Sequence, residues 1–198
     1  MTSGSGVAGA LLTGGASRRM GFDKTVVEVG GVPNARRLAA VLRQVAGPLV
    51  EVGPGRSGLT AVSEHPPGQG PLVAACAARE VLQAAGHSGP ILLLASDLPF
   101  MTAEVLTVIV TWPGSASVVP RVDGLAQPLC ARWSAADLAA AAVLVAEGER
   151  SMRLLVRRPG VVFVDQEEWP ESVARHAFAD ADTLDDLARL GLAGPGGF

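Results

Sequence analysis

The segment Val7-Ala8-Gly9-Ala10-Leu11-Leu12-Thr13-Gly14-Gly15 begins with a short apolar run that ends at two glycines. An apolar run of this length, bounded by turn residues, predicts a buried strand over Val7–Leu12. A basic loop follows at once, with the sequence Ala16-Ser17-Arg18-Arg19-Met20-Gly21-Phe22-Asp23-Lys24. Glycines let a main chain bend closely around an anion, and arginine and lysine supply compensating positive charge. The segment therefore predicts a strand followed by a phosphate-binding loop.

The basic loop fits neither of two common phosphate-binding patterns. GxxxxGK[ST] requires a glycine directly before the lysine, whereas Asp23 precedes Lys24 here, and GxGxxG is absent as well. A glycine turn followed by a solvated basic loop is therefore the alternative interpretation. The position directly after a predicted buried strand favours phosphate binding.

The rest of the chain alternates between predicted strands and predicted helices. Strands are predicted at Val7–Leu12, Val26–Val29, Leu49–Val52, Leu59–Val62, Ile91–Ala95, Ser117–Val119, Leu129–Trp133 and Val161–Val164. Helices are predicted from Pro33 to Gly47, over Leu72–Ala85, after Thr102, over Ser134–Ala146, after Ser151 and after Thr183. This alternation predicts an α/β fold of three layers, with a mainly parallel sheet and helices on both faces. Sheets of this kind bind ligands at the carboxyl ends of their strands.

Length and composition exclude several classes of protein. The 198 residues fit one domain, residues 1–198, with a tail from about residue 194 that is predicted to be disordered. A net charge of −3 and the absence of tyrosine argue against nucleic acid as a binding partner. The basic cluster in an acidic chain instead suggests a small anionic ligand.

The sequence contains no apolar run of the roughly 18–20 residues that span a bilayer, so no membrane partner is expected. No signal peptide is recognised at Met1–Gly6, which predicts a cytoplasmic location. Cys76 and Cys130 lie far apart without metal-ligand spacing, so a buried and reduced pair is expected. The protein is expected to be a monomer or a weak homo-oligomer.

Three aspartates are candidates for binding a metal ion. Asp97 follows the predicted strand Ile91–Ala95, and its carboxylate would suit Mg²⁺; the alternative is that it accepts hydrogen bonds from loop amides. Asp180 and Asp182 follow Phe178, which is expected at another strand end. One of them is a candidate second ligand, and the alternative is N-capping of the last helix.

Four arginines follow the Ser134–Ala146 helix and are open to two interpretations. They would bind an anionic acceptor, or they would form the exposed side of a helix. The second interpretation is slightly favoured. The four are Arg150, Arg153, Arg157 and Arg158.

The pattern LxGGxSxRMGxDK, read from Leu12 to Lys24, resembles the signature of the molybdenum-cofactor guanylyltransferase family, a group of single-domain nucleotidyltransferases. Further segments resemble the GPL, CDxP, PL and FxNxNT elements of that family. They are Gly68–Leu72, Ala95–Phe100, Gln127–Leu129 and Phe178–Thr183. The chain departs from the family pattern at four positions. Thr13 stands where the family has alanine, and Ser96 stands where it has cysteine. Asp180 and Asp182 replace two asparagines.

The resemblance implies a Rossmann-like fold, Mg²⁺ as cofactor, and a nucleoside triphosphate as substrate. It implies transfer of GMP from GTP to the terminal phosphate of molybdopterin, with release of pyrophosphate. The implied catalytic residues are Arg19, Lys24 and Asp97. The implied nucleotide-binding residues are Leu12, Thr13, Gly14, Gly15, Arg18, Lys24, Glu64 and Asp97. Asp97 is the implied metal ligand, with Asp180 or Asp182 as the possible second one.

Other functions stay open from the sequence. The same chemistry would serve a cytidylyltransferase for a related pterin cofactor, or a nucleotidyltransferase for a phosphorylated metabolite or a sugar phosphate. A nucleotide-binding module that has lost catalysis is an alternative of a different class. The retained Asp97 and Lys24 argue against that module.

Overall fold

The computed structural model describes residues 6–14, 28–64, 68–169 and 175–179. Several predictions fall outside these residues and stay predictions. They concern the site candidates Gly15, Arg18, Arg19, Lys24, Asp180 and Asp182, the start of the strand Val26–Val29, and the helix after Thr183.

The centre of the molecule is one mostly parallel sheet, which confirms the predicted fold class. Its strands are β1 (Ala8–Leu12), β4 (Leu49–Val52), β5 (Ala61–Val62), β6 (Ile91–Ala95), β7 (Val118–Val122), β8 (Leu125–Ala126), β9 (Cys130–Trp133) and β10 (Val162–Asp165). They lie in the order β10-β7-β9-β6-β1-β4-β5, with β8 paired to β7. β1 is parallel to both β4 and β6, whereas β9 is antiparallel to β6. A separate hairpin is formed by β2 (Glu28–Val29) and β3 (Val32–Pro33).

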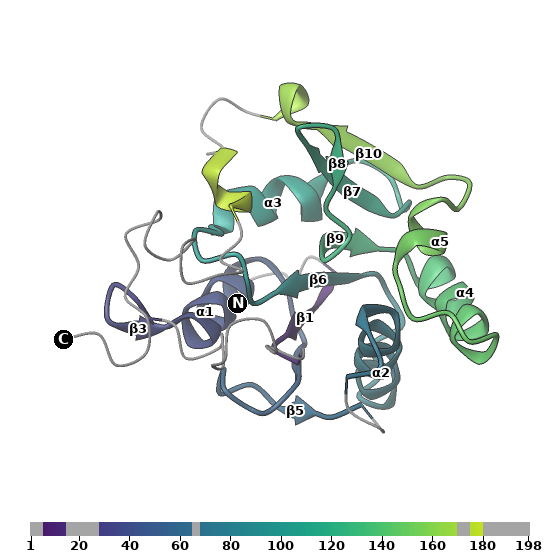
Figure 1. The fold of residues 1–198 in the computed structure, drawn as a ribbon, viewed down its shortest axis with the longest axis horizontal. Coiled ribbons are helices and arrows are strands. Elements are labelled where there is room, and N and C mark those ends of the chain that lie inside the picture. The colour runs from purple at the N-terminus through teal and green to yellow at the C-terminus, as the bar shows by residue number, and fades with distance from the viewer. Residues whose placement is uncertain (1–5, 15–27, 65–67, 170–174, 180–198) are drawn as a thin grey trace.

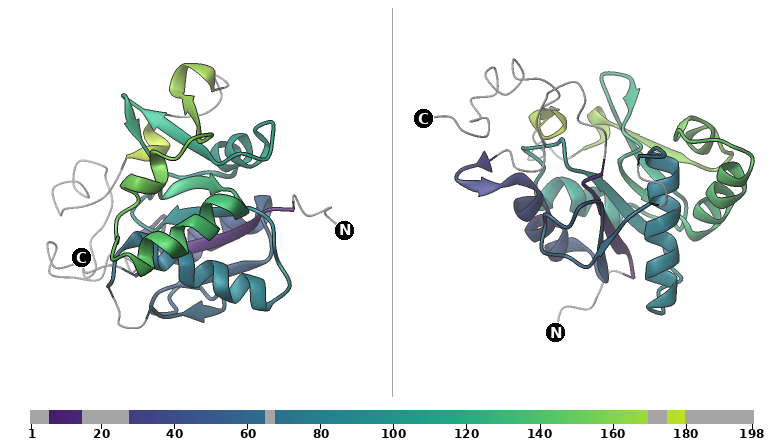
Figure 2. Two further views of the ribbon diagram at one scale, coloured as in Figure 1. Left: turned by 90° about the vertical axis from the view of Figure 1, so that its right-hand side faces the viewer. Right: turned by 60° about the horizontal axis from the view of Figure 1, so that its bottom comes forward.

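Helices cover both faces of this sheet. β1 and β6 are therefore buried along their full lengths. α1 (Asn34–Val45) and α3 (Ala103–Thr111) contribute to the core on one face. α2 (Pro71–Ala84), α4 (Ala135–Ala146) and the short α5 (Arg153–Val156) contribute to the core on the other. Figure 1 shows β1 and β6 side by side in the middle of the molecule. Figure 2 shows α2 and α4 lying next to each other over the sheet.

Side chains mark the ends of several elements, and one of these ends corrects a prediction. The Ser134 side chain caps α4 and accepts a hydrogen bond from the Asp137 amide at 3.1 Å. α5 begins at Arg153 with Met152 as its N-cap residue, and the Met152 side chain is buried in the core. Phe178 ends a short 3₁₀ helix, Arg175–Phe178, instead of a strand. Its ring stacks on Trp169 with a centroid separation of 5.1 Å, which places it by packing rather than by sheet pairing.

Three further side chains, those of Cys76, Cys130 and Arg132, are buried. Cys76 and Cys130 are both buried free thiols, as predicted. The buried guanidinium group of Arg132 donates hydrogen bonds of 2.7–3.2 Å to the carbonyls of Val110, Trp112, Gly114 and Ala116. It thereby satisfies carbonyls that the end of α3 leaves without helical partners. Among the described residues, every helix is too short or too polar to cross a bilayer.

A buried carboxylate holds the carboxyl end of β4. Glu51 is fully buried, and its two oxygens accept hydrogen bonds from the Thr13 hydroxyl, the Ser57 hydroxyl, and the amides of Gly55, Arg56 and Ser57. Burial by itself raises the pKa of this carboxyl. The hydrogen bonds from Ser57, Thr13 and Arg56 outweigh that effect and leave the pKa below its ordinary value of 4.5. The charged Glu51 therefore joins the end of β1 to the loop 53–57.

We expect Glu51→Gln to lower the free energy of unfolding by about 1–3 kcal/mol at neutral pH, because one acceptor oxygen becomes an NH₂ group among donors. A lowered pKa in the folded state stabilises the protein above the ordinary pKa, and this stabilisation is lost as the pH falls through the lowered value. The difference between the two proteins should therefore shrink below pH 4.5, as measured by urea unfolding between pH 3 and 8.

The exposed Glu80 on α2 provides the matched control. Glu80→Gln should change the free energy of unfolding by less than about 0.5 kcal/mol at every pH. A difference between wild type and Glu51→Gln that stays constant down to pH 3 would contradict a charged Glu51.

Candidate functional site

Three neighbouring parallel strands end together and form the centre of the candidate site. Leu12 is in register with Val52 of β4 on one side and with Ala95 of β6 on the other. The amides of Thr13 and Gly14 both donate to the Val52 carbonyl at 3.0 Å, and the Ser96 amide donates to the Leu12 carbonyl at 3.1 Å. The start of the predicted phosphate loop and the residue before Asp97 therefore lie at the ends of adjacent strands. Parallel α/β sheets bind ligands at this edge.

The turn after β1 is packed tightly against the turn after β4. A Cβ atom on Gly53 would lie 2.1 Å from the Thr13 hydroxyl oxygen and 2.6 Å from the Gly14 nitrogen. The φ of Gly53 is +150°, which side chains rarely adopt. Glycine is thus required at residue 53 for Thr13 to reach Glu51. The Thr13 hydroxyl and the Thr13 amide are both used in contacts within the protein, which fix the turn after β1.

Asp97 lies just beyond the end of β6 and is partly exposed. Complete burial raises the pKa of the Cys130 thiol and the charge of Asp97 raises it further, so the thiol stays protonated. A partly exposed carboxylate at this edge fits Mg²⁺, which is usually bound by one or two carboxylates together with substrate phosphates and water. Within the described part of the chain, no group of three or more His, Cys, Asp or Glu side chains forms a metal-binding cluster.

Two residues of α1 hold the loop that carries Asp97; we call Asn34 and Arg37 the α1 brace. The Asn34 side-chain amide donates to the Ser96 carbonyl at 2.9 Å. The Arg37 guanidinium donates to the carbonyls of Met101 and Leu98 at 2.8 and 3.3 Å, and to Asn34 Oδ1 at 3.1 Å. Each end of the 96–101 loop is thereby tied to the first turns of one helix.

Glu64 follows β5, which is parallel to β4, and therefore lies at the same edge of the sheet. Its Oε2 atom accepts a hydrogen bond of 2.8 Å from the Gln69 amide, in the segment that leads into α2. The carboxylate thus stabilises the loop before α2. A contact between Glu64 and a nucleotide stays a prediction.

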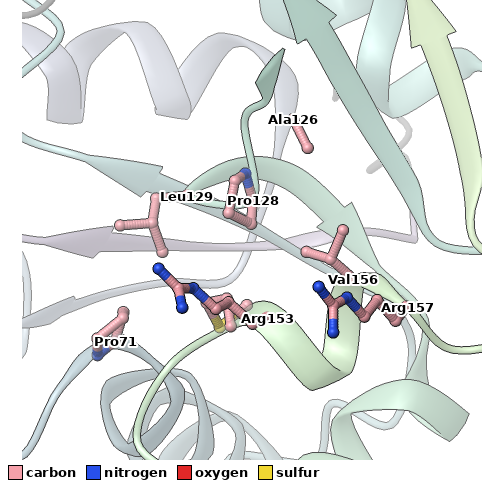
Figure 3. A pocket seen from close by; sticks show the side chains of 8 residues that line it. Pro71, Ala126, Pro128, Leu129, Arg153, Val156 and Arg157 are labelled. Atoms are coloured by element: carbon pink, nitrogen blue, oxygen red, sulfur yellow. The ribbon is translucent and has the colours of Figure 1, made fainter. Parts of the chain in front are cut away.

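An open pocket with a volume of about 380 Å³ lies beside these strand ends, on the α2 and α5 side of the sheet. Its apolar lining comes from three segments, and two arginines complete it. The lining residues are Pro71, Ala126, Pro128, Leu129, Met152, Arg153, Val156 and Arg157. Figure 3 shows the side chains of Arg153 and Arg157 extending from α5 toward the space in front of Pro128 and Leu129.

The described structure brings together the sequence candidates Leu12, Thr13, Gly14 and Asp97, with Glu64 at the same edge. The remaining candidates belong to the residues outside the description. Sequence reasoning missed Glu51, although a lone carboxylate within the apolar strand Leu49–Val52 was a visible signal. It also missed the α1 brace, because Asn34 and Arg37 carry no signal apart from their three-residue spacing on a helix.

Known proteins are similar to this chain in sequence and in architecture. Residues 9–167 match the family model described as "MobA-like NTP transferase domain". A probable molybdenum cofactor guanylyltransferase of Opitutus terrae is 35% identical over 83% of this chain and 87% of that protein. The molybdenum cofactor guanylyltransferase of Rhodobacter capsulatus is 30% identical over 92% of this chain and 94% of that protein.

The crystal structure of molybdopterin-guanine dinucleotide biosynthesis protein A from Archaeoglobus fulgidus superposes with a TM-score of 0.73 at 24% identity. The match covers 92% of this chain and 96% of the other, and it supports the fold. The length of the family match and the identity to the relatives confirm the resemblance found in the sequence. The chain therefore belongs to the MobA-like NTP transferase family and is a nucleotidyltransferase.

Proposed function

We propose that this enzyme transfers GMP from GTP to the terminal phosphate of molybdopterin and releases pyrophosphate. The observation that carries the proposal is the placement of the Thr13-Gly14 turn and Asp97 at adjacent parallel strand ends. A nucleotide bound at this edge would contact both the turn and Asp97. Relatives of this chain also carry the name molybdenum cofactor guanylyltransferase. The buried free thiols agree with the reducing cytoplasm that the sequence predicts.

The proposed reaction is a direct transfer without a covalent enzyme intermediate. An oxygen of the acceptor phosphate forms a bond to the α-phosphorus of GTP, and the bond from that phosphorus to the pyrophosphate oxygen breaks. The side chains of Arg18, Arg19 and Lys24 would offset the negative charge of the triphosphate. Asp97 would hold Mg²⁺, which supplies charge neutralisation at phosphate oxygens when bound. The backbone of the Leu12–Gly14 turn would position the nucleoside.

The substrate assignment is tested by incubating the purified protein and Mg²⁺ with each of the four nucleoside triphosphates, with and without molybdopterin. We expect pyrophosphate release and formation of the guanine dinucleotide only when GTP and molybdopterin are both present. Activity with CTP alone would replace guanylyl with cytidylyl transfer. Triphosphate binding without pyrophosphate release for any acceptor would indicate a module that has lost catalysis.

Asp97→Ala and Lys24→Ala should each lose at least about 99% of turnover, because each removes a charge that stabilises the transition state. Circular dichroism and thermal unfolding should show that both variants stay folded. Near-normal activity of a folded Asp97→Ala protein would exclude Asp97 as the metal ligand.

The α1 brace should determine how well Asp97 is positioned. We expect Asn34→Ala and Arg37→Ala to raise the Mg²⁺ concentration for half-maximal rate by about tenfold, because small displacements of catalytic groups are costly. The KM for GTP at saturating Mg²⁺ should change much less. Arg37→Lys should not restore the Mg²⁺ dependence, since a lysine cannot reproduce the planar fork of hydrogen bonds.

Arg36 provides the matched control, because it is the adjacent residue of the same helix and is exposed. Arg36→Ala should leave the Mg²⁺ dependence unchanged. Equal Mg²⁺ dependence in the wild type and in both folded brace variants would contradict the positioning role.

A further inference from the structure

We propose that the pocket between α2, α5 and the Pro128–Leu129 segment binds the acceptor of the transfer, a phosphorylated organic anion, with Arg153 and Arg157 as its cationic contacts. This inference rests on the proposed function, because it assigns the second substrate of that reaction.

The pocket lies directly beside the strand end that carries Asp97. The Ala95 amide of β6 donates to the Leu129 carbonyl at 2.8 Å, and Leu129 lines the pocket. Pro71 lines it from the start of α2, which follows β5 at the same edge of the sheet. β6 therefore separates the pocket from the Thr13-Gly14 turn. An acceptor in the pocket and a nucleotide over that turn would approach Asp97 from opposite sides.

The four arginines of this region divide into two structural and two pocket-lining residues. Arg158 pairs with Asp137 at 2.7 Å, and Arg150 donates to the carbonyls of Val145 and Glu149 at 3.0 and 2.8 Å. Arg153 and Arg157 are exposed and line the pocket instead. The expectation that all four form a merely exposed helix side is therefore too simple. Arg153 at the start of α5 and Arg157, its C-cap residue, lie beside the cavity.

The walls of the pocket fit an organic anion better than a free inorganic phosphate. Six of the lining residues are apolar, and Met152 among them is buried. A volume of about 380 Å³ is within the range of small-molecule sites. Flat rings pack well against proline and leucine surfaces, whereas guanidinium groups bind phosphate and other anions. The combination selects an acceptor with both an apolar ring and negative charge.

The base of the pocket is held in place by main-chain contacts. The Leu72 amide of α2 donates to the Arg150 carbonyl at 3.1 Å. A Cβ atom on Gly70 would lie 2.7 Å from that same oxygen, so glycine at residue 70 permits the contact. The segment before α5 and the start of α2 are thus joined. The two arginines project from a fixed wall, which reduces the entropy that ligand binding must overcome.

The test is steady-state kinetics of the double variant Arg153→Gln/Arg157→Gln with GTP, molybdopterin and Mg²⁺. We expect the KM for molybdopterin to rise at least about tenfold, while the KM for GTP stays within about twofold of the wild type. The acceptor KM of the wild type should also rise with salt concentration, and that dependence should be weaker in the variant. Restoration of both charges as Arg153→Lys/Arg157→Lys should recover part of the loss.

Two further variants separate a specific pocket from a general charge effect. Arg43→Gln removes one exposed positive charge from α1, on the opposite face of the sheet, and should leave both KM values unchanged. Ala126→Phe places a ring in the pocket without changing any charge and should raise the acceptor KM alone.

The outcomes distinguish this inference from the proposed function. Wild-type activity with molybdopterin, combined with an unchanged acceptor KM in the arginine and Ala126→Phe variants, would overturn the pocket assignment and leave the function intact. A rise in the KM for GTP instead would assign the pocket to the nucleotide. Absence of wild-type activity with molybdopterin would overturn the proposed function, and with it the acceptor named here.

Discussion

The parallel pairing of β1 with both β4 and β6 is the constraint on which the rest of the structure depends. It places three strand ends next to one another and directs each following loop to the same edge of the sheet. β1 and β6 can occupy the centre because all ten of their residues are buried. Their hydrogen-bonding groups are satisfied by neighbours on both sides, so the polar chemistry is confined to the loops after Leu12, Val52 and Ala95.

Different elements fix the loops at this edge by contacts that the substrate does not supply. Glu51 joins the end of β1 to the 53–57 loop through a cluster of donors around one buried carboxylate. The α1 brace of Asn34 and Arg37 holds the loop with Asp97 through main-chain carbonyls. The hydrogen bonds of Glu51 and of the α1 brace are made to other groups of the protein. They therefore pre-organise the edge before a ligand arrives, and positioning of this kind is a main source of catalysis in phosphoryl and nucleotidyl transfer.

The antiparallel strand β9 gives the site its asymmetry. It lies between β6 and β7 and brings the residues that precede it, Pro128 and Leu129, to the carboxyl edge. A parallel strand at this position would instead have placed the residues that follow it at this edge. The β1 side of the edge is built from glycine turns, and the β9 side from an apolar wall with two arginines. The proposed nucleotide site and the proposed acceptor site would thus differ in chemistry, with Asp97 between them.

The sequence by itself determined the alternation of strands and helices, the α/β class and the family, because these depend on hydrophobic periodicity, glycine turns and a long motif that are all local in the chain. It also determined that Asp97 would follow a buried strand. Only the tertiary structure decided which polar residues cooperate. Glu51 and Thr13 are 38 residues apart in the sequence, Asn34 and Ser96 are 62 apart, and Arg153 and Pro71 line the same pocket. Such partners share no local pattern, since their proximity follows from strand order and helix packing.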